Sequence, residues 1–421
     1  MSPYEPFSAD VRDDPYPHYA ALRQDAPLHW AAEAQTWCVS RHEDVQFVLR
    51  SPELFSSDAM RTMLIGARPG RDPLSDPEAM ERVMAFAKAF PFPIEELATS
   101  RQLISEDPPR HGSMRQIVNR GFTPRRIAAW EPRLRTVVAD CVASLAARDQ
   151  FDLVSDVAIP VPVRIISEML GVEPDRFEEF KAWSDGVIAA TTGSARDLDP
   201  VESGFVSSVH ALLTYVQEVA AERRRNPGDD LISVLVAAQE GDAGLTAAEV
   251  ANFVMLLLLA GNETTTNLIG NAALALLRHP EQLERVAADR SLVPALIEET
   301  LRWDSPVQFV FRRSTQDIDI AGGRIPANTY VLPLIGSANR DERQWGPDAA
   351  VFDVARNPQG HLAFGFGNHF CLGAALARLE ARIALESLLD ELPHRRLAEE
   401  QTEYVDSFLV RGPRKLELQR V

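Results

Sequence analysis

A single cysteine near the C-terminal end of the sequence lies among residues whose types could do chemistry. Residues 364–373 read FGFGNHFCLG, which places Cys371 among three glycines and one histidine. The chain has only three cysteines, far apart in the sequence, so they form no disulfide framework. A free thiol in such a setting can be a nucleophile, a metal ligand or a buried structural residue.

Each of these roles needs different neighbours. A nucleophile would use His369 as its base, but residues two apart on an extended chain point to opposite sides. A closed zinc site needs more Cys or His ligands nearby, and Cys38 and Cys141 do not provide them. A thiolate can also be the only protein ligand of a metal that is already held by something else, such as haem iron.

The residues that flank Cys371 favour the haem. Gly365 and Gly367 let the backbone approach a flat ring and curl around the sulfur. Free amides in such a loop can donate hydrogen bonds to the thiolate. A strongly helical run of about nineteen residues follows, and a helix N-terminus stabilises a negative sulfur. A dinucleotide-binding fingerprint is excluded, because Phe370 stands where the third glycine would be.

A second group of polar residues lies inside the longest apolar helix that the sequence predicts. Thr246 and Glu249 form a capping box that starts this helix, and Pro280 ends it after Arg278. Its middle reads LLLLAGNETTTN, in which a glycine and three threonines are poor helix formers and Glu263 has apolar neighbours. We expect either a kink or bulge at a functional site, or a buried helix whose polar residues face a solvent gap.

Composition limits the class of protein. The 421 residues carry 43 basic and 61 acidic side chains, a formal net charge of −18 that argues against a nucleic-acid partner. The longest apolar run is shorter than the ~20 residues that span a bilayer, and the N-terminal residues lack a signal-peptide pattern. The odd, scattered cysteines fit a reducing cytoplasm. We therefore expect a cytoplasmic protein with no membrane partner.

The elements that must position these residues are mainly helical, with small β-sheets. Strand patterns occur at residues 36–40 and 307–333, and the tail at 403–419 predicts a closing hairpin. Residues 125–278 are almost wholly helical in pattern. The irregular segment 57–107 contains a helix start at Asp76, with Phe86 and Phe90 on one apolar face. One large domain over residues 1–421 is expected.

Four motifs in order resemble those of the cytochrome P450 family in its soluble bacterial form. The cysteine stretch is similar to F-G-x-G-x-H-x-C-L-G, and residues 260–265 to the oxygen-activation segment A-G-x-[DE]-T-T. Glu299 and Arg302 match the E-x-x-R pair, and residues 107–124 match D-P-P-x-H-x-x-x-R…F-T-P. The resemblance covers essentially the whole chain. Segment 57–107 is longer than in many bacterial members, which leaves substrate contacts there open.

The resemblance implies a cytochrome P450 fold, with a long central helix over haem b and a cysteine-ligand loop beneath it. Cys371 would supply the thiolate to iron. Glu299 and Arg302 would form a buried structural pair. Arg313 is the alternative to Arg312 if the register shifts by one. The residues that match haem or propionate contacts in the family are His111, Arg115, Arg312, His369, Phe364, Gly365, Gly373 and Ala260.

The resemblance also implies a reaction. Glu263 and Thr264 match the acid–alcohol pair that relays protons to bound dioxygen, which favours an O2-dependent monooxygenase over a peroxide-using enzyme. The substrate would be an apolar small molecule, hydroxylated at a C–H bond or epoxidised. Each pocket residue taken alone fits the core better than a substrate contact. By family position, those that would line the pocket are Leu256, Leu259, Phe309, Phe408 and Leu409, with Phe86 and Phe90 on a lid.

Electrons would come from NAD(P)H through a separate ferredoxin and ferredoxin reductase, because nothing in these residues resembles a nucleotide- or flavin-binding motif. A monomer is expected. The basic residues of the expected docking face are Arg110, Arg115, Arg120, Arg125, Arg126, Arg378 and Arg382. Two other classes remain open on the residues alone: a haem sensor or carrier, and a thiol hydrolase built on Cys371. The identity of the substrate is left open.

Overall fold

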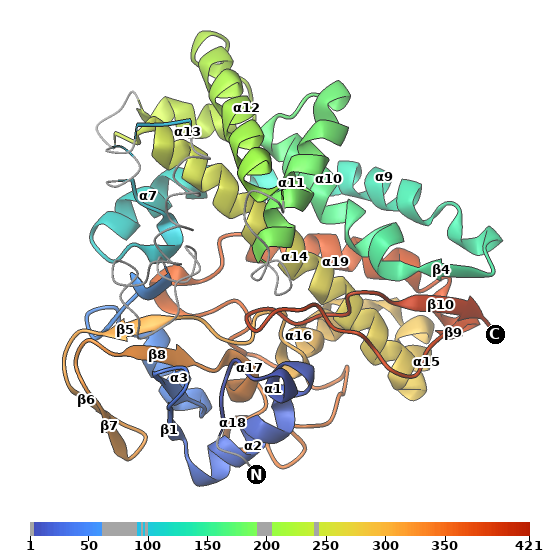
Figure 1. Ribbon diagram of the computed structural model, residues 1–421. Helices are drawn as coiled ribbons and strands as arrows, with labels where there is room; N and C mark the ends of the chain where they lie inside the picture. Colours follow the sequence, from blue (N-terminus) through green and yellow to red (C-terminus); the bar gives the residue numbers. More distant parts are fainter. Residues whose placement is uncertain (1–3, 61–90, 94–95, 97–99, 192–203, 240–243) are drawn as a thin grey trace.

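Helices make up most of the molecule, and the strands gather beside the N-terminal segment. The computed structural model describes residues 4–60, 91–93, 96, 100–191, 204–239 and 244–421. Figure 1 shows the helices of the middle of the chain in the upper part of the view and the largest sheet below them. This arrangement is the predicted one, mainly α with small β-sheets.

The helices fall into three groups along the chain. The N-terminal helices are α1 (Ala9–Asp13), α2 (Pro15–Asp25) and α3 (His42–Arg50). The central helices are α7 (Arg110–Asn119), α8 (Pro124–Ala129), α9 (Glu131–Val142), α10 (Pro160–Leu170), α11 (Phe177–Thr191), α12 (Phe205–Arg225), α13 (Leu231–Gln239) and α14 (Ala247–Arg278). The C-terminal helices are α15 (Pro280–Ala288), α16 (Val293–Trp303), α17 (Ile335–Ala338), α18 (Glu342–Trp345) and α19 (Ala374–Leu388).

The described strands form three sheets. The five-stranded sheet has the order β1 (Leu28–Ala31), β2 (Thr36–Val39), β8 (Tyr330–Pro333), β5 (Arg312–Ser314), β3 (Phe55–Ser56). The three-stranded sheet has the order β4 (Gln150–Asp152), β10 (Glu417–Arg420), β9 (Arg395–Leu397), and β6 (Ile318–Ile320) pairs with β7 (Gly323–Ile325). Pairing is antiparallel except between β2 and β8.

The strand predictions are confirmed in outline. Residues 36–39 and the region 312–333 form strands as expected. The closing hairpin is smaller than predicted, because its pairing is a single antiparallel bridge between Tyr404 and Pro413. The last strand, β10, pairs instead with β4 and β9, which are distant in the sequence.

The long central helix has the predicted ends. The Thr246 hydroxyl accepts from the Glu249 amide at 3.1 Å, and the Glu249 carboxylate accepts from the Thr246 amide at 3.0 Å. At ~1.5 Å per residue, the 32 residues of α14 extend about 48 Å. Of the two expectations for its middle, a bulge is not found, because α14 stays α-helical through Gly261 and the threonines. Thr265 and Thr266 are buried while Gly261 and Thr264 are half-buried, so packing on one side of the helix outweighs the weak helix propensity of these residues.

The core surrounds α14. The largest cluster of buried apolar side chains includes much of α14 and residues of α9, α10, α12, α16 and α19. α14 packs directly against α10, α16 and α19, so the helix after the cysteine lies against the central helix. Two smaller clusters lie under the N-terminal segment and around the five-stranded sheet.

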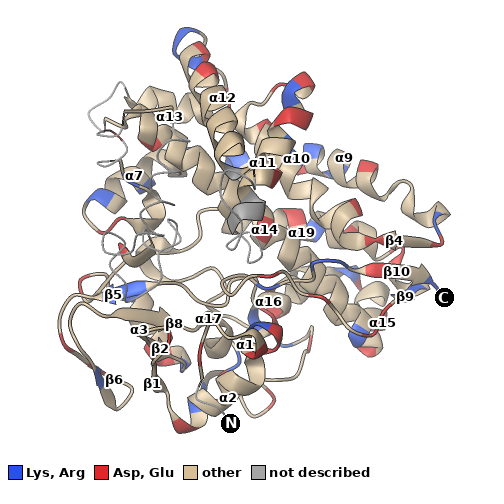
Figure 2. Cartoon of the chain, viewed as in Figure 1, with Lys and Arg blue, Asp and Glu red and all other residues tan. Residues whose placement is uncertain are grey.

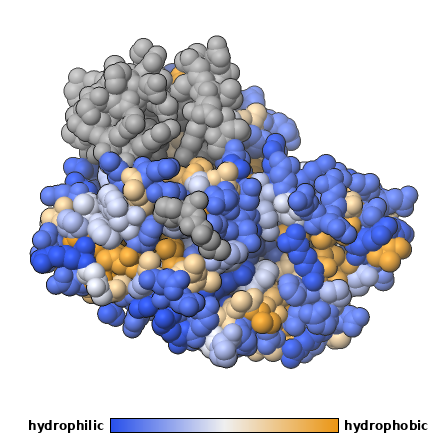
Figure 3. Space-filling model, turned by 60° about the horizontal axis from the view of Figure 1, so that its bottom comes forward, coloured by the Kyte–Doolittle hydropathy of each residue, from blue (hydrophilic) through white to orange (hydrophobic). Residues whose placement is uncertain are grey.

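The surface is mixed in charge and in polarity. Figure 2 shows acidic and basic groups side by side on the outer helices, not separated onto two faces. On the face shown in Figure 3, hydrophobic residues form small patches among hydrophilic ones. No helix among the described residues combines the length and the apolar content needed to cross a bilayer.

Candidate functional site

The cysteine loop is held by its own backbone hydrogen bonds. The Gly365 amide donates to the carbonyl of Leu362 at 2.8 Å, and the Cys371 amide donates to the carbonyl of Phe364 at 2.8 Å. Gly365 and Gly367 have φ values of +71° and +69°, which disfavour any residue with a Cβ. A Cβ on Gly367 would also lie 3.1 Å from the carbonyl oxygen of Leu49. Both glycines are therefore needed for the turn that places the sulfur.

The sulfur of Cys371 lies at the N-terminus of α19, which begins at Ala374. Burial raises the pKa of the Cys371 thiol, while the backbone amides of Gly373 and Ala374 and the guanidinium of Arg115 act in the opposite direction. These groups favour the anion, and a coordinated metal would complete its deprotonation. α19 ends at Leu388 and is 15 residues long, shorter than predicted.

The alternative roles for Cys371 find no support here. Among the described residues, no three His, Cys, Asp or Glu side chains gather in a way that could hold a metal ion, which removes the zinc site. The ring of His369 contacts the hydroxyl of Ser57 at 2.9 Å and lies 4.2 Å from the ring of His111. His369 is therefore engaged with other residues and not poised as a base.

Four basic side chains from three separate segments come together beside the loop. His111 and Arg115 belong to α7, Arg312 to β5, and His369 to the loop. Burial lowers the pKa of His369 to about 3, with further contributions from Arg312, His111 and Arg115. Burial and the charge of Arg115 likewise lower the pKa of His111. Of the four, His111 and Arg312 are buried and Arg115 and His369 are half-buried, and such a cluster of donors favours an anionic ligand.

Two of these groups are buried, and one of them has an unsatisfied polar atom. The Nε2 atom of His111 is buried without a hydrogen-bond partner among the described residues. Arg312 is 4% exposed and donates a hydrogen bond to the carbonyl of its neighbour Phe311 at 2.8 Å. Burial lowers the pKa of Arg312 to about 10, and Asp107 opposes this change. The adjacent Arg313 is instead half exposed and paired with Asp58. The predicted register, with Arg312 facing inward, is the one found.

The middle of α14 turns a face with little steric obstruction toward this region. Ala260 is exposed although it lies halfway along the central helix. A Cβ built on Gly261 would meet no described atom within 4 Å, and the same holds for Gly373 after the cysteine. Ala260 and Thr264 lie one turn apart, so they share this face. A flat ligand between helix and loop would contact small residues on both sides.

Glu263 and Thr264 lie on adjacent positions of the same turn. Burial raises the pKa of Glu263 to about 7, so the acid and its conjugate base are both populated near neutral pH. The Thr264 hydroxyl donates to the carbonyl of Ala260 at 2.6 Å, which leaves its oxygen lone pairs to accept. A carboxyl group poised near pH 7 beside a fixed hydroxyl is suited to proton transfer.

Comparison with known proteins identifies the family. The family model for cytochrome P450 matches residues 73–420. Cytochrome P450 107B1 of Saccharopolyspora erythraea is 36% identical and covers 97% of this chain and 96% of its own length. The chain belongs to the cytochrome P450 family. It is therefore a monooxygenase that carries haem b on a cysteine thiolate.

Solved cytochrome P450 structures agree with the fold. CYP109Q5 from Chondromyces apiculatus superposes with a TM-score of 0.85 at 38% identity, over 99% of this chain and 98% of that one. CYP109E1 from Bacillus megaterium, solved in complex with corticosterone, gives a TM-score of 0.81 at 34% identity, over 98% and 99% of the two chains. The cytochrome P450 fold predicted from the motifs is confirmed.

The described residues of this cytochrome P450 fit haem b. Its two propionates are anions, and they would contact the buried guanidinium of Arg312 and the buried Nε2 of His111, which has no hydrogen-bond partner among the described residues. Its flat ring matches the small residues on α14 and on the loop, and the thiolate matches iron. The phenyl ring of Phe364 and the glycines of the loop would lie along the ring.

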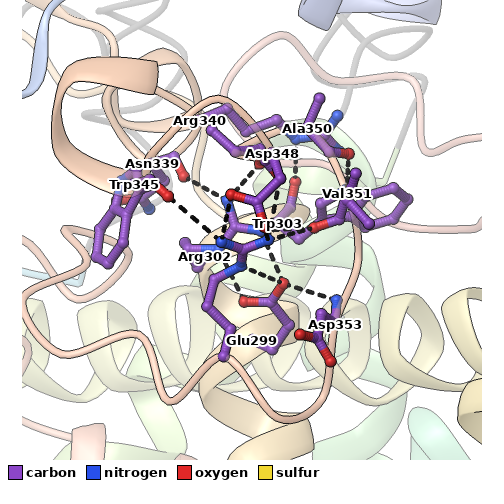
Figure 4. A network of polar contacts seen from close by, with 12 residues as sticks. Glu299, Arg302, Trp303, Asn339, Arg340, Trp345, Asp348, Ala350, Val351 and Asp353 are labelled. Carbon is purple, nitrogen blue, oxygen red and sulfur yellow. Dashed lines mark hydrogen bonds and ion pairs between the residues drawn. The ribbon is translucent and has the colours of Figure 1, made fainter.

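Glu299 and Arg302 are fully buried and join α16 to the chain that leads into the cysteine loop (Figure 4). Two hydrogen bonds of 2.8 and 2.7 Å join the guanidinium to the carboxylate. Arg302 also donates to three carbonyls, those of Asn339, Ala349 and Val351. Because every donor and acceptor of the pair is used, the pair holds the segment 339–353 in place.

The predicted substrate residues fall into two groups. Leu256 and Leu259 are half buried on α14 and pack against the main core. The others lie in a second cluster under the N-terminal segment, where Phe7 contacts Phe309 edge-on at 6.2 Å between ring centroids. The members of this second group are Phe309, Phe408 and Leu409. Phe86 and Phe90 lie outside the described residues.

Several relevant residues were not predicted. Phe7 and Phe311 stack at 6.3 Å within the second cluster, and no motif marks Phe7. Glu380 on α19 is buried and receives a hydrogen bond from Thr265 of α14. Its position nine residues after Cys371 on a helix was the signal that could have found it. Glu298 is a further residue that the sequence analysis passed over.

The basic docking face is smaller than predicted. Arg378 pairs with Glu298 at 2.6 Å, and Arg382 pairs with Glu131 at 3.0 Å. Arg110 is paired with Glu249. These ion pairs neutralise three of the seven arginines assigned to the docking face. The exposed arginines without an ion pair among the described residues are Arg120 and Arg125.

Proposed function

We propose that this cytochrome P450 inserts one atom of dioxygen into an apolar small molecule, by hydroxylation of a C–H bond or by epoxidation. The observation that carries the proposal is the Glu263–Thr264 pair on the open face of α14. The pKa of Glu263 is raised to about 7 by burial. A haem sensor or carrier has no use for such a pair, and family membership removes the thiol hydrolase.

Each residue of the candidate site is assigned a separate role. We assign Cys371 as the iron ligand, and His111, Arg115, Arg312 and His369 as propionate partners. When bound, haem b supplies the iron at which dioxygen is activated, and thiolate donation favours cleavage of the O–O bond. Glu263 holds a proton on its carboxyl group and passes it through water toward the hydroxyl of Thr264. The surrounding leucines keep other water out.

The substrate is proposed to be apolar because the candidate contacts are aliphatic and aromatic. Leu256 and Leu259 on α14 and the Phe309–Phe408 group would form its walls. The structure of CYP109E1 with corticosterone shows that a structural relative accommodates a fused-ring molecule. A compound that displaces water from the iron would shift the Soret absorption band, so a screen of apolar compounds by this shift identifies the class.

Electrons are proposed to come from NAD(P)H through a ferredoxin reductase and a separate ferredoxin that docks at the cysteine loop. Phe366 and Phe370 of this loop are 38% and 42% exposed, unusually high for large apolar side chains. Arg115 of α7 donates to the carbonyl of Phe370 at 2.7 Å, which brings α7 next to the loop. The acidic side chains of a ferredoxin would lie opposite Arg120 and Arg125, which follow the C-terminal end of α7 in the sequence.

We place the enzyme in the cytoplasm as a monomer. Its three cysteines are free, as expected in a reducing compartment. Sedimentation of the holoenzyme tests the oligomeric state.

The docking site is tested by charge reversal. Arg120→Glu with Arg125→Glu should lower the ferredoxin-driven rate several-fold at low salt, with a smaller effect at high salt. Arg224→Glu is the matched control, because Arg224 is exposed at the C-terminal end of α12. An unchanged rate at low salt would contradict the assigned docking face.

The central assignment is tested by replacing the ligand. The reduced wild-type protein under carbon monoxide should absorb near the wavelength that names the family, and Cys371→Ala should lose this band. Cys141→Ala is the matched control, because its thiol is half exposed and belongs to α9. A spectrum that survives in Cys371→Ala would overturn the assignment of the ligand.

A further inference from the structure

A second ion pair, next to the Glu299–Arg302 pair, reaches the cysteine loop. Glu298 of α16 accepts from Arg378 of α19 through both oxygens, at 2.6 and 2.8 Å. This fork is bidentate, the geometry that fixes a guanidinium most firmly. The Glu298 and Arg378 side chains are 22% and 37% exposed, so the pair lies at the edge of the core.

A histidine completes the pair on the buried side. His361 Nε2 lies 2.9 Å from the second oxygen of Glu298, and the amide of Ala363 donates to His361 Nδ1 at 3.3 Å. Because Nδ1 accepts, Nε2 carries the proton and donates to the carboxylate, so a neutral imidazole satisfies both contacts. The group therefore contains one negative and one positive charge.

The positive end of this group faces the loop that holds the sulfur. The guanidinium carbon of Arg378 lies 4.5 Å from the ring centroid of Phe364, which is cation–π distance. Phe364 in turn accepts the amide hydrogen of Cys371 at 2.8 Å. The chain of contacts from Glu298 to Arg378, then to Phe364 and Cys371, is continuous.

The charges of this group agree with its geometry. Although burial alone would raise it, hydrogen bonds from Arg378 and His361 lower the pKa of Glu298 to about 2. The guanidinium of Arg378 lies against the ring of Phe364, whose carbonyl accepts from the Cys371 amide, so its charge is placed beside the loop that carries the sulfur.

We propose that Glu298 positions Arg378 over Phe364 and that the two charges together set the reduction potential of the haem. Reduction of ferric to ferrous iron adds one negative charge at the iron–thiolate centre. A nearby positive charge stabilises the reduced form, and a nearby negative charge opposes it. Arg378 raises the potential, Glu298 offsets part of that effect, and both are positioning residues. This inference rests on the proposed assignment of Cys371 as ligand.

The charges predict shifts of opposite sign. Glu298→Gln removes the negative charge and keeps one side-chain acceptor for Arg378, so the uncompensated Arg378 should raise the midpoint potential. Arg378→Gln leaves Glu298 uncompensated, so the potential should fall. We expect about a threefold change in the ferrous-to-ferric ratio at fixed potential in each direction, about 28 mV for a one-electron couple at 59 mV per tenfold. The double variant should return close to wild type.

The experiment is a spectroelectrochemical titration of the purified holoenzymes with dithionite as reductant. Arg378→Lys keeps the charge without the fork and should stay near wild type. Arg382→Gln is the matched control, because this arginine lies one turn further along α19 and pairs with Glu131 and Glu386. Its potential should not change.

The outcomes separate this inference from a purely structural role and from the ligand assignment. If the substitutions merely loosened the loop, the midpoint potentials of both single variants would shift in the same direction. If the charges of the pair did not act on the haem, neither potential would shift. Either result overturns the inference. If Arg378→Gln loses the thiolate spectrum, the inference is tested by the other two variants. The midpoint potential must then rise in Glu298→Gln and stay at the wild-type value in Arg378→Lys. A wild-type protein without the thiolate spectrum would instead overturn the assignment of Cys371.

Discussion

The hydroxyl of Thr264 donates a 2.6 Å hydrogen bond to the carbonyl oxygen of Ala260, one turn earlier on α14. A hydroxyl has one hydrogen, so this bond fixes the direction of its lone pairs. They point away from Ala260 and can accept a proton donor, such as a water molecule, on the open side of the helix. Thr264 is thus an oriented acceptor within the helix.

Removal of this hydroxyl should uncouple electron use from product formation. Thr264→Ala should bind haem normally, yet lower the product formed per NAD(P)H by about tenfold or more, because proton delivery loses its fixed acceptor. The missing reducing equivalents should appear as hydrogen peroxide. Product, peroxide and NAD(P)H are measured in one assay, with Thr264→Ser as control. Unchanged coupling in Thr264→Ala would contradict the role.

The proton supply should depend on pH through Glu263. Its pKa is raised to about 7 by burial, so the carboxyl group is protonated below that pH and loses its proton above it. With ferredoxin in excess, the turnover rate should fall as pH rises through about 7. Glu263→Gln should be slower by about 100-fold and should lack this fall, whereas Glu263→Asp should keep it. A wild-type profile that is flat between pH 6 and 8 would count against the assignment.

Two adjacent arginines should differ in their effect on haem retention. Arg312 is buried and donates to the carbonyl of Phe311, whereas Arg313 is half exposed and paired with Asp58. Arg312→Gln should speed the transfer of haem to apomyoglobin by about tenfold, since a hydrogen bond to a charged group contributes roughly 1.5–3 kcal/mol. Arg313→Gln should transfer haem at the wild-type rate. Equal rates in the two variants would mean that Arg312 does not hold a propionate.

The buried Glu299–Arg302 pair should be essential for stability. Arg302→Ala removes the two hydrogen bonds that this guanidinium donates to buried Glu299 and leaves the longer contact with Arg356 at 3.3 Å, which should cost about 3 kcal/mol of the free energy of unfolding. Arg324→Ala, which removes an exposed ion pair with Asp317, should change it by less than about 1 kcal/mol. Urea unfolding followed by circular dichroism compares the two. Similar midpoints for the two variants would show that the pair is dispensable.

Glu380 should make the protein less stable as pH rises. Burial raises the pKa of Glu380 from its ordinary 4.5 to about 8, and the Thr265 hydrogen bond opposes the shift. Between these values the unfolded chain releases the proton and the folded chain keeps it, so the free energy of unfolding falls with rising pH. Above about pH 8 the folded protein ionises too and the decline ends. Glu380→Gln should remove this loss, on the order of 3–5 kcal/mol, in urea titrations at pH 5.5, 7 and 8.5. Parallel curves for the two proteins would contradict the shifted pKa.

Motifs within one segment made much of the site predictable. The loop around Cys371 and the capped helix could be located because glycine, proline and capping residues act over a few positions. The inward side chain of Arg312 rather than Arg313 could not be fixed, because a slip of one residue exchanges the two faces of a strand. The group formed by Glu298, His361 and Arg378 was also missed. His361 and Arg378 lie 63 and 80 positions after Glu298 in the sequence, and only tertiary packing brings the three side chains together.

Predictions from local propensity failed where packing decides. Gly261 and the threonines after it weaken a helix in isolation, yet α14 passes through them unbroken, because Thr265 and Thr266 are buried and the helix packs against α10, α16 and α19. The basic docking face was overestimated for a related reason. A sequence shows where arginines occur, but not that Arg382 and Arg110 are already bound to carboxylates.

The loop that carries Cys371 is shaped by partners from much earlier in the chain. Gly367 lies against the backbone of Leu49, and the carbonyl of Phe370 accepts from Arg115, 255 positions upstream. Contacts between residues so far apart in the sequence form slowly during folding, after local contacts have formed. Because Cys371 follows both Leu49 and Arg115 in the sequence, the loop can reach this shape only after those two earlier segments have been synthesised.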